Sequence, residues 1–267
     1  MLFRRLFLCA LLVGLLTGLF DSAVQRWQIV PLILAAEVFE ASAAPPQVEH
    51  AHAAGATHSH EAQAWAPQDG LERTAYTVLA NVLNAIGSAL LLMPLLAFWN
   101  RQRAGQPLAL HKGYGASMRY GLLWGAAGWV CLFALPALGQ APELPGMQAA
   151  ALHERQVWWS LTVACGAGGL AVLGMVRAKW RVLGLGLLVL PFAIGAPQHA
   201  GSPFAGMEAD VALQMQQLVS RFVVATAVAS AVQWLLLGTL SALAVARWLS
   251  PLLNPVAAAT RLEGTAS

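Results

Sequence analysis

Residues 74–99 read TAYTVLANVLNAIGSALLLMPLLAFW, a run of 26 residues without a charged side chain. A helix needs about 20 mostly apolar residues to cross the hydrocarbon core of a bilayer, so this run is long enough to span it. The whole chain has the same character, because 58% of its 267 residues are hydrophobic and 10% are charged, whereas soluble domains are about 25% charged. The sequence therefore predicts an all-α integral membrane protein, with residues 1–267 forming a single membrane domain.

Further apolar segments before and after this run bring the expected number of transmembrane helices to about six. Their expected bounds are 6–30, 74–99, 117–139, 157–176, 182–198 and 219–247. The fifth is the weakest, because its apolar core is short and contains two glycines and a proline. Outside the spans we expect a His- and acid-rich outer loop at 41–70 and a cytoplasmic tail at 249–267.

The basic residues predict the orientation of these spans. Eleven of them fall on the side of the two termini, while the opposite loops hold only Arg73, Arg155 and Arg221. Because Lys and Arg favour the cytoplasmic side, both termini should be cytoplasmic. Ten of the twelve acidic residues and six of the seven histidines fall on the outer side. Acidic groups contribute little to topology, so this outward bias needs a separate, functional reason.

The densest group of outer ligands is the stretch Glu49-His-Ala-His-Ala-Ala-Gly-Ala-Thr-His-Ser-His-Glu61. Imidazole suits divalent cobalt, nickel, copper and zinc, and carboxylates add charge. We therefore predict that this loop collects a divalent transition-metal cation, Co²⁺ first and Ni²⁺ or Zn²⁺ as alternatives, as cargo and not as a permanent cofactor. The predicted outer ligands are His50, His52, His58, His60, Glu61, Glu37, Glu40, His153 and His199. The alternative interpretation is that a polar, variable loop accumulated histidines that have no function.

Polar residues within the spans predict the path of the ion. Lipid-facing helices should be apolar all round, so a polar stripe at helical spacing marks an interior face. Spans 1, 2 and 6 each carry such a stripe, and the predicted path residues are Asp21, Gln25, Asn81, Asn84 and Gln233. Two alternatives stay open: interhelical hydrogen bonding for the stripes, and a structural ion pair between Asp21 and Arg26 or another helix.

Three helical hairpins related by an internal repeat are also suggested by the sequence. The outward-going spans end with Pro31 and Glu37, with Pro136 and Glu143, and with Pro191 and Gln198. Each outer loop then leads to an arginine at the start of the returning span: Arg73, Arg155 and Arg221. The glycines of spans 3 and 4 are expected to serve close helix packing. The alternative to a repeat is convergence, since Pro and Gly often mark helix ends.

The chain resembles the CbtA family of probable cobalt transporter subunits. The matching stretches are Pro31-Leu-Ile-Leu-Ala-Ala-Glu-Val-Phe-Glu40, His58-Ser-His60, Trp65-Ala-Pro-Gln-Asp-Gly-Leu-Glu-Arg73, Pro142-Glu-Leu-Pro-Gly146, Arg155-Gln-Val-Trp-Trp159 and Leu190-Pro-Phe-Ala-Ile-Gly-Ala-Pro197. The resemblance implies a multi-pass protein of the bacterial inner membrane, linked to cobalt uptake for cobalamin synthesis. It also implies a small, single-span, histidine-containing partner protein (CbtB).

Other functional classes fit the sequence less well. No H-E-x-x-H or G-x-S-x-G motif supports an enzyme, and no phosphate-binding glycine loop supports ATP hydrolysis. We therefore expect no enzymatic activity and no nucleic-acid partner; the expected partners are the lipid bilayer, the small CbtB-like protein, and further copies of the chain in an oligomer. The second hypothesis is a scaffold that binds metal and delivers it to a partner without transporting it.

Overall fold

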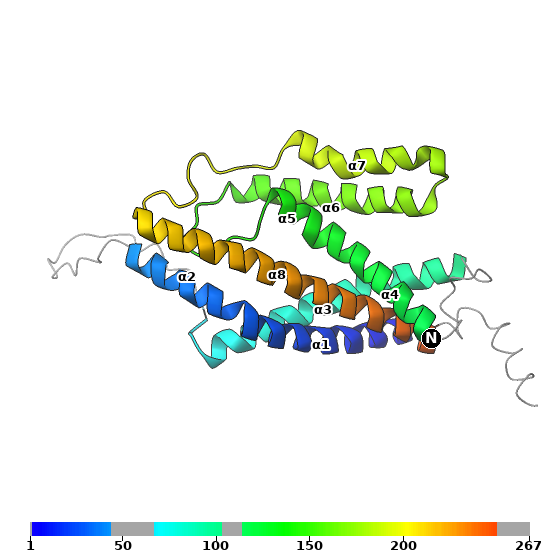
Figure 1. Ribbon diagram of the computed structural model, residues 1–267. Coiled ribbons are helices and arrows are strands. Elements are labelled where there is room, and N and C mark those ends of the chain that lie inside the picture. Colours follow the sequence, from blue (N-terminus) through cyan, green and yellow to red (C-terminus); the bar gives the residue numbers. More distant parts are fainter. Residues whose placement is uncertain (1, 44–66, 103–113, 250–267) are drawn as a thin grey trace, which may run out of the picture.

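The computed structural model describes residues 2–43, 67–102 and 114–249, and these residues form helices joined by loops (Figure 1). Five helical stretches in these ranges are long and apolar enough to cross a membrane. They are Leu2–Gln28, Leu71–Gln102, Gly115–Gly139, Leu152–Met175 and Ala209–Leu249. The prediction of an all-α membrane protein is confirmed.

The elements follow one another as a series of long passes. They are α1 (Leu2–Gln28), α2 (Val30–Ala43), α3 (Leu71–Gln102), α4 (Tyr114–Trp129), a π-helical turn (Val130–Ala134), α5 (Leu135–Gly139), α6 (Leu152–Met175), a 3₁₀ turn (Ala178–Trp180), α7 (Arg181–Ile194), α8 (Ala209–Ala244) and a second π-helical turn (Val245–Leu249). The N-terminus and the end of α8 lie at the same end of the bundle (Figure 1). We call this the inner end, after the predicted orientation, and the opposite one the outer end.

The expected fifth span is shorter than predicted. In place of a helix over 182–198, the structure has α7, Arg181–Ile194, with 14 residues. At 1.5 Å per residue α7 is about 21 Å long, less than the hydrocarbon core of about 30 Å. The helix ends where Gly195 adopts φ +93°, a conformation that glycine tolerates best. The described residues thus hold five long spans, not six, and α7 returns the chain along α6 (Figure 1).

Prolines interrupt the outward-going helices near their outer ends. Pro31 lies in the first turn of α2, directly after the break that ends α1. Pro136 lies at the start of α5, directly after the π-helical turn Val130–Ala134. Pro191 lies within α7, close to its end at Ile194. Because proline has no N–H to donate, each position removes one helical hydrogen bond and favours a break or a bulge there.

Small residues decide which helices pack together. The tightest pairs are α1 with α3, α4 with α8, and α6 with α7. A Cβ atom added to Gly18 of α1 would lie 2.5 Å from the Cα of Val82, and one added to Gly169 of α6 would lie 2.9 Å from the carbonyl oxygen of Gly184. Such close backbone approach is what small-residue faces allow in membranes. Gly169 thus has the packing role predicted for the glycines of spans 3 and 4, as does Gly125 of α4, where a Cβ would clash with the carbonyl oxygen of Trp234. Gly18 adds a contact that was not predicted.

The three expected hairpins are therefore closed to different degrees. The first is closed, because α1 packs on α3, while α2 packs on α1 and α8. In the second, α4 packs on α8, where a Cβ at Gly121 would lie 2.6 Å from the carbonyl oxygen of Gly238. Its returning helix, α6, contacts mainly α5 and the π-helical turn Val130–Ala134 on the outward-going side. The third hairpin, α7 with α8, is open in the same way, because α7 packs mainly on α6 and not on α8.

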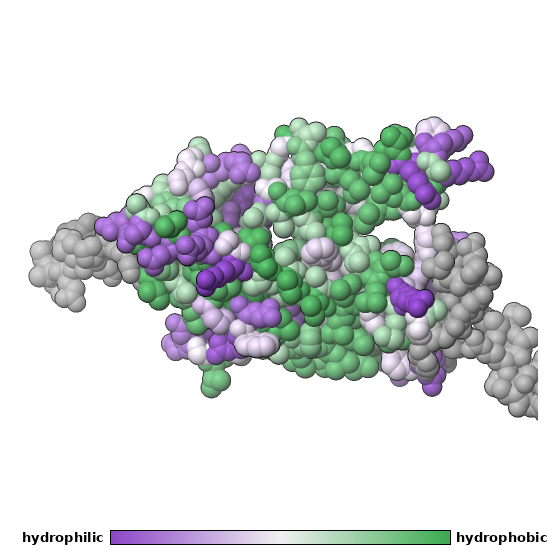
Figure 2. Space-filling model, in the orientation of Figure 1, coloured by the Kyte–Doolittle hydropathy of each residue, from purple (hydrophilic) through white to green (hydrophobic). Residues whose placement is uncertain are grey.

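Two apolar cores stabilise the bundle, one towards each end. The inner core joins α1, α3, α4 and α8 through residues such as Val13, Met93 and Leu237. The outer core joins α1, α2, α8 and the loop after α5 through residues such as Ile29 and Met215. On the outside, Figure 2 shows apolar surface over the middle of this face and hydrophilic side chains gathered mainly towards the two ends, as expected for a protein that crosses a bilayer.

Candidate functional site

A hydrogen-bonded group of polar side chains joins α1 to α3. Asp21, in α1, is only 3% exposed. One helical turn later, Gln25 donates from Nε2 to Asp21 Oδ2 at 2.8 Å, and the same nitrogen lies 3.4 Å from Oδ1 of Asn81 in α3. Three of the five predicted path residues are thus brought together by the packing of two helices.

Ser22 completes this contact. Asn81 donates from Nδ2 to Ser22 Oγ at 3.2 Å, and Ser22 donates to the carbonyl oxygen of Gly18 at 2.7 Å. The close approach of α3 to Gly18 is what brings Asn81 within reach of α1. The sequence analysis missed Ser22; its position between Gly18 and Gln25 on the small-residue side of α1 was the available signal.

These side chains form a polar layer between the two apolar cores, which we define as Thr17, Asp21, Ser22, Gln25, Asn81 and Gln233. On α1, the inner core ends at Val13 and the outer core begins at Val24. On α8, Gln233 is buried between Ala229 of the outer core and Leu237 of the inner core. Thr17 is fully buried, and its Oγ1 has no hydrogen-bond partner among the described residues. The layer therefore places hydrogen-bonding groups where a membrane bundle is otherwise apolar.

No arginine or lysine within the described ranges pairs with Asp21. The ion pairs found there are Arg73 with Glu37, Arg73 with Asp69, and Arg155 with Glu143. Arg26, the structural partner considered for Asp21, is exposed. Asn84 is also exposed and lies outside the polar layer, so the structure does not bring this predicted path residue to Asp21.

At the outer end, Glu37 of α2 is held by Arg73 at the start of α3. Arg73 donates from Nη1 to Glu37 Oε2 at 3.0 Å and from Nη2 to Glu37 Oε1, so both carboxylate oxygens accept a hydrogen bond. Arg73 also pairs with Asp69 at 3.0 Å. About a third of each of the Arg73 and Glu37 side chains is exposed, so water competes with this pair.

A second acid–arginine pair occurs at the equivalent place of the second hairpin. Glu143, after α5, forms an ion pair with Arg155 in α6, with 2.9 Å between Oε2 of Glu143 and Nη2 of Arg155. The sequence repeat had matched Glu143 with Glu37 and Arg155 with Arg73, and the structure pairs each acid with its arginine. In the third unit, Gln198 donates to the carbonyl oxygen of Gly139 at 3.4 Å, and Arg221 is exposed.

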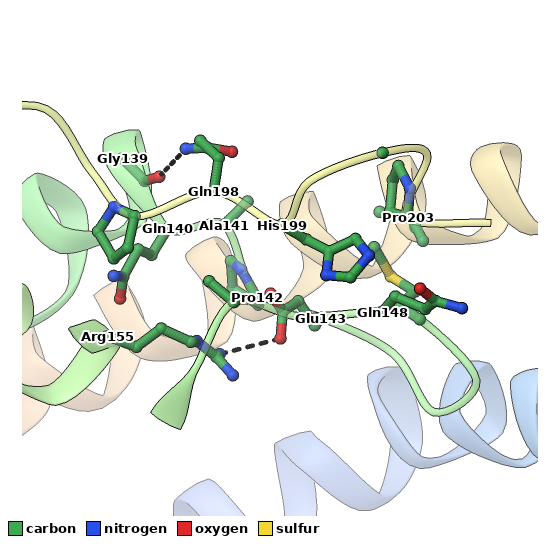
Figure 3. A pocket seen from close by; sticks show the side chains of 15 residues that line it. Gly139, Gln140, Ala141, Pro142, Glu143, Gln148, Arg155, Gln198, His199 and Pro203 are labelled. Carbon is green, nitrogen blue, oxygen red and sulfur yellow. Dashed lines mark hydrogen bonds and ion pairs between the residues drawn. The ribbon is translucent and has the colours of Figure 1, made fainter. Parts of the chain in front are cut away.

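A pocket of about 210 Å³ opens beside Glu143 and Arg155, between the loop after α5 and the loop after α7 (Figure 3). His199, Gln198, Gln148 and Gln140 also line it. His199 is half-buried there. Glu143 was not among the predicted ligands, although its match to Glu37 in the repeat was a signal for it.

The remaining predicted metal ligands are spread over the outer end or lie outside the described residues. His50, His52, His58, His60 and Glu61 belong to 44–66 and so cannot be placed. Glu40 is exposed near the end of α2, and His153 is exposed in the first turn of α6. Among the described residues, no three His, Cys, Asp or Glu side chains come close enough together to hold a metal ion.

Comparison with known proteins gives one informative result. Among the curated proteins and the solved structures, none matches this chain. The family described as "Probable cobalt transporter subunit (CbtA)" matches residues 3–246, which cover α1 to α8 together with the polar layer and the outer pairs. The chain therefore belongs to the family of probable cobalt transporter subunits (CbtA).

Proposed function

We propose that this chain carries a divalent transition-metal cation, cobalt first, inward across the bacterial inner membrane, and that the cobalt supplies cobalamin synthesis. Membership in a cobalt transporter family supports the choice of cobalt. The five long apolar helices support a multi-pass membrane location. The path in this proposal runs through the polar layer between α1, α3 and α8.

The observation that carries the proposal is the environment of Asp21. An ionised carboxylate buried in a membrane protein is costly unless a positive group compensates it. Asp21 is 3% exposed, and none of the ion pairs in the described residues involves it. A cation passing through the polar layer would supply that positive charge. The amide oxygens of Gln25, Asn81 and Gln233 and the free Oγ1 of Thr17 add uncharged oxygens of the kind that can replace water around an ion.

The outer residues collect the ion in this scheme. The loop histidines His50, His52, His58 and His60, with Glu61, raise the local concentration of metal. Ordering a loop on binding costs conformational entropy, so such a loop would hold ions only loosely. Glu37, Glu40, His153 and His199 then offer further ligands around the outer end. Deleting residues 49–61 is accordingly expected to raise the cobalt concentration needed for half-maximal uptake and to leave the maximal rate intact.

The membrane potential is sufficient to drive such uptake. Moving one charge through 100 mV is worth about 2.3 kcal/mol, so a divalent ion entering an inside-negative cell gains about 4.6 kcal/mol. This corresponds to an accumulation of roughly two thousandfold at 1.4 kcal/mol per factor of ten. A channel-like path therefore needs no ATP hydrolysis by this chain.

The family's description as a transporter component supports a role for a partner. We propose that the partner is a small, single-span, histidine-containing protein of the bilayer. The same description favours a second candidate function, in which the chain binds metal and delivers it to the partner without transporting it. The two functions differ in whether metal accumulates inside the cell.

The deciding experiment is uptake of radiolabelled cobalt into cells without other cobalt importers, with this chain expressed alone and with the small partner protein. Asp21→Asn keeps the size of the side chain and an oxygen for Gln25 to donate to, but removes the charge. The matched control is Glu154→Gln, an exposed carboxylate on α6. We expect uptake by the wild type and the control and almost none by Asp21→Asn. Cobalt bound at the cell surface without accumulation in either condition would favour the delivery function instead.

A further inference from the structure

The pocket at the outer end lies where two matching parts of the sequence meet. One wall follows Leu135-Pro136 and includes Gly139, and the other follows Leu190-Pro191 and includes Gln198. Trp158 of α6 joins the two, because its Nε1 donates to the carbonyl oxygen of Pro191 at 3.2 Å and a Cβ at Gly139 would touch its ring. The pocket is thus built into the packing of α5, α6 and α7.

Several of the polar side chains that line the pocket carry electron-pair donors, among them Glu143, Gln148 and His199 (Figure 3). Glu143 gives one carboxylate oxygen to Arg155, which leaves its second oxygen as an acceptor. The amide nitrogen of Gln148 donates to the carbonyl oxygen of Ala205 at 3.4 Å, and that of Gln198 donates to Gly139. Each glutamine therefore keeps its amide oxygen as the remaining acceptor. With the imidazole of His199, these oxygens make a mixed set of donors for a borderline metal ion.

The geometry points to a second, weak binding site for a hydrated divalent metal cation in this pocket, with Glu143 and His199 as its ligands and Arg155 as a built-in competitor for Glu143. The inference rests on the proposed function for the kind of ion. At about 30 Å³ per water molecule, the pocket has room for an ion together with its bound waters. Such an ion can bind through two protein ligands and keep the rest of its water shell.

Arg155 is placed to keep this site weak and exchangeable. It holds Glu143 through one contact at 2.9 Å, whereas Arg73 holds Glu37 through both of its terminal nitrogens. The Arg155 and Glu143 side chains are each 31% exposed, so water screens their attraction. An arriving cation therefore exchanges for Arg155 at Glu143 more readily than for Arg73 at Glu37. A site of this kind takes up an ion from the outer side and gives it up again.

The test is equilibrium binding of ⁵⁷Co²⁺ to the purified full chain in lipid nanodiscs. The parent for the test carries Asp21→Asn and alanine at His50, His52, His58 and His60, so that neither the polar layer nor the loop contributes. Failure of the pocket site is thereby separated from failure of the proposed transport path, which is tested by uptake. In this parent we expect one weak site. The absorption spectrum of the bound cobalt should show that at least one of its ligands is a nitrogen.

His199→Ala and Glu143→Gln should each raise the Kd at least roughly tenfold, as loss of a metal-site contact usually does. Glu154→Gln, which changes an exposed carboxylate on α6 outside the pocket, should leave the Kd unchanged. Arg155→Gln should lower the Kd several-fold, a gain that misfolding would not produce. Equal binding by the parent, His199→Ala and Glu143→Gln would overturn the site, and an unchanged Kd in Arg155→Gln would overturn the competitor role.

Discussion

The carboxylates of the polar layer and of the outer end of the molecule lie in opposite environments. At the outer end, Glu37 and Glu143 are each paired with an arginine and remain about a third exposed. In the polar layer, Asp21 is almost fully buried, and its hydrogen-bond donor is the neutral amide of Gln25. A charge in water tolerates the loss of its partner, whereas a buried charge does not. The difference indicates that the outer acids are stable without metal, while Asp21 has the greater need for a cation.

The difference between the two regions depends first on the close contact between α1 and α3, which holds the polar layer together. Replacing Gly18 by Val should push α3 away from α1, because even a Cβ would lie 2.5 Å from Val82 Cα. We expect loss of nearly all cobalt uptake and destabilisation by about 1–3 kcal/mol, as for other overpacked contacts. Uptake and thermal unfolding in detergent measure the two effects. Gly87→Val is the matched control, since nothing lies within 4 Å of a Cβ there; equal effects of the two changes would contradict the argument.

Giving Asp21 an arginine of its own should make it resemble the outer acids. Gln25→Arg places a guanidinium one turn from Asp21, where Gln25 already donates to it. A paired carboxylate no longer attracts a passing cation, so we expect uptake to fall at least about tenfold, equivalent to about 1.4 kcal/mol. Gln28→Arg, at an exposed position of the same helix, should keep normal uptake. Normal transport by Gln25→Arg would contradict the proposed path through the polar layer.

The converse experiment removes the arginine from an outer acid, by breaking the ion pair of Glu37 and Arg73. Because Glu37 and Arg73 are partly exposed, breaking their ion pair should cost less than about 1 kcal/mol of stability. If Glu37 also receives the ion, Glu37→Gln should raise the cobalt concentration for half-maximal uptake, and Arg73→Gln, which frees the carboxylate, should not. The concentration dependence of uptake separates the two variants. Equal increases in both would show that Glu37 acts only as the partner of Arg73.

The two asparagines of α3 give the smallest expected difference. Asn81 bonds to α1, whereas Asn84 is exposed. Loss of one interhelical hydrogen bond costs about 0.6 kcal/mol, so Asn81→Ala should reduce uptake roughly threefold. Asn84→Ala should change it by less than about twofold, within the range of a surface substitution. A larger effect of Asn84→Ala in the same uptake assay would extend the path to a face that the polar layer does not include.

Much of the fold follows from local properties of the sequence. Long apolar runs identified the five long helices, and the apolar stretch 182–198 was correctly expected to be the weakest, although its shortening to Arg181–Ile194 was not foreseen. The spacing of Asp21 and Gln25 predicted that they share a face of α1. It did not separate Asn81 from Asn84, because three residues along a helix still leave an angle of about 60° between two side chains.

The sequence by itself determined which segments are apolar enough to enter a membrane and which side chains share a helix face, because hydropathy and helical spacing are properties of one segment. Only the tertiary structure decided the partners: α4 beside α8, α6 beside α7, and Asn81 beside Ser22 and Gln25. It also decided that Glu37 and Glu143 are paired with arginines while Asp21 is not, within the described residues. The reason is that helix association in a bilayer depends on how small residues on two separate helices fit together, and no single segment contains that information.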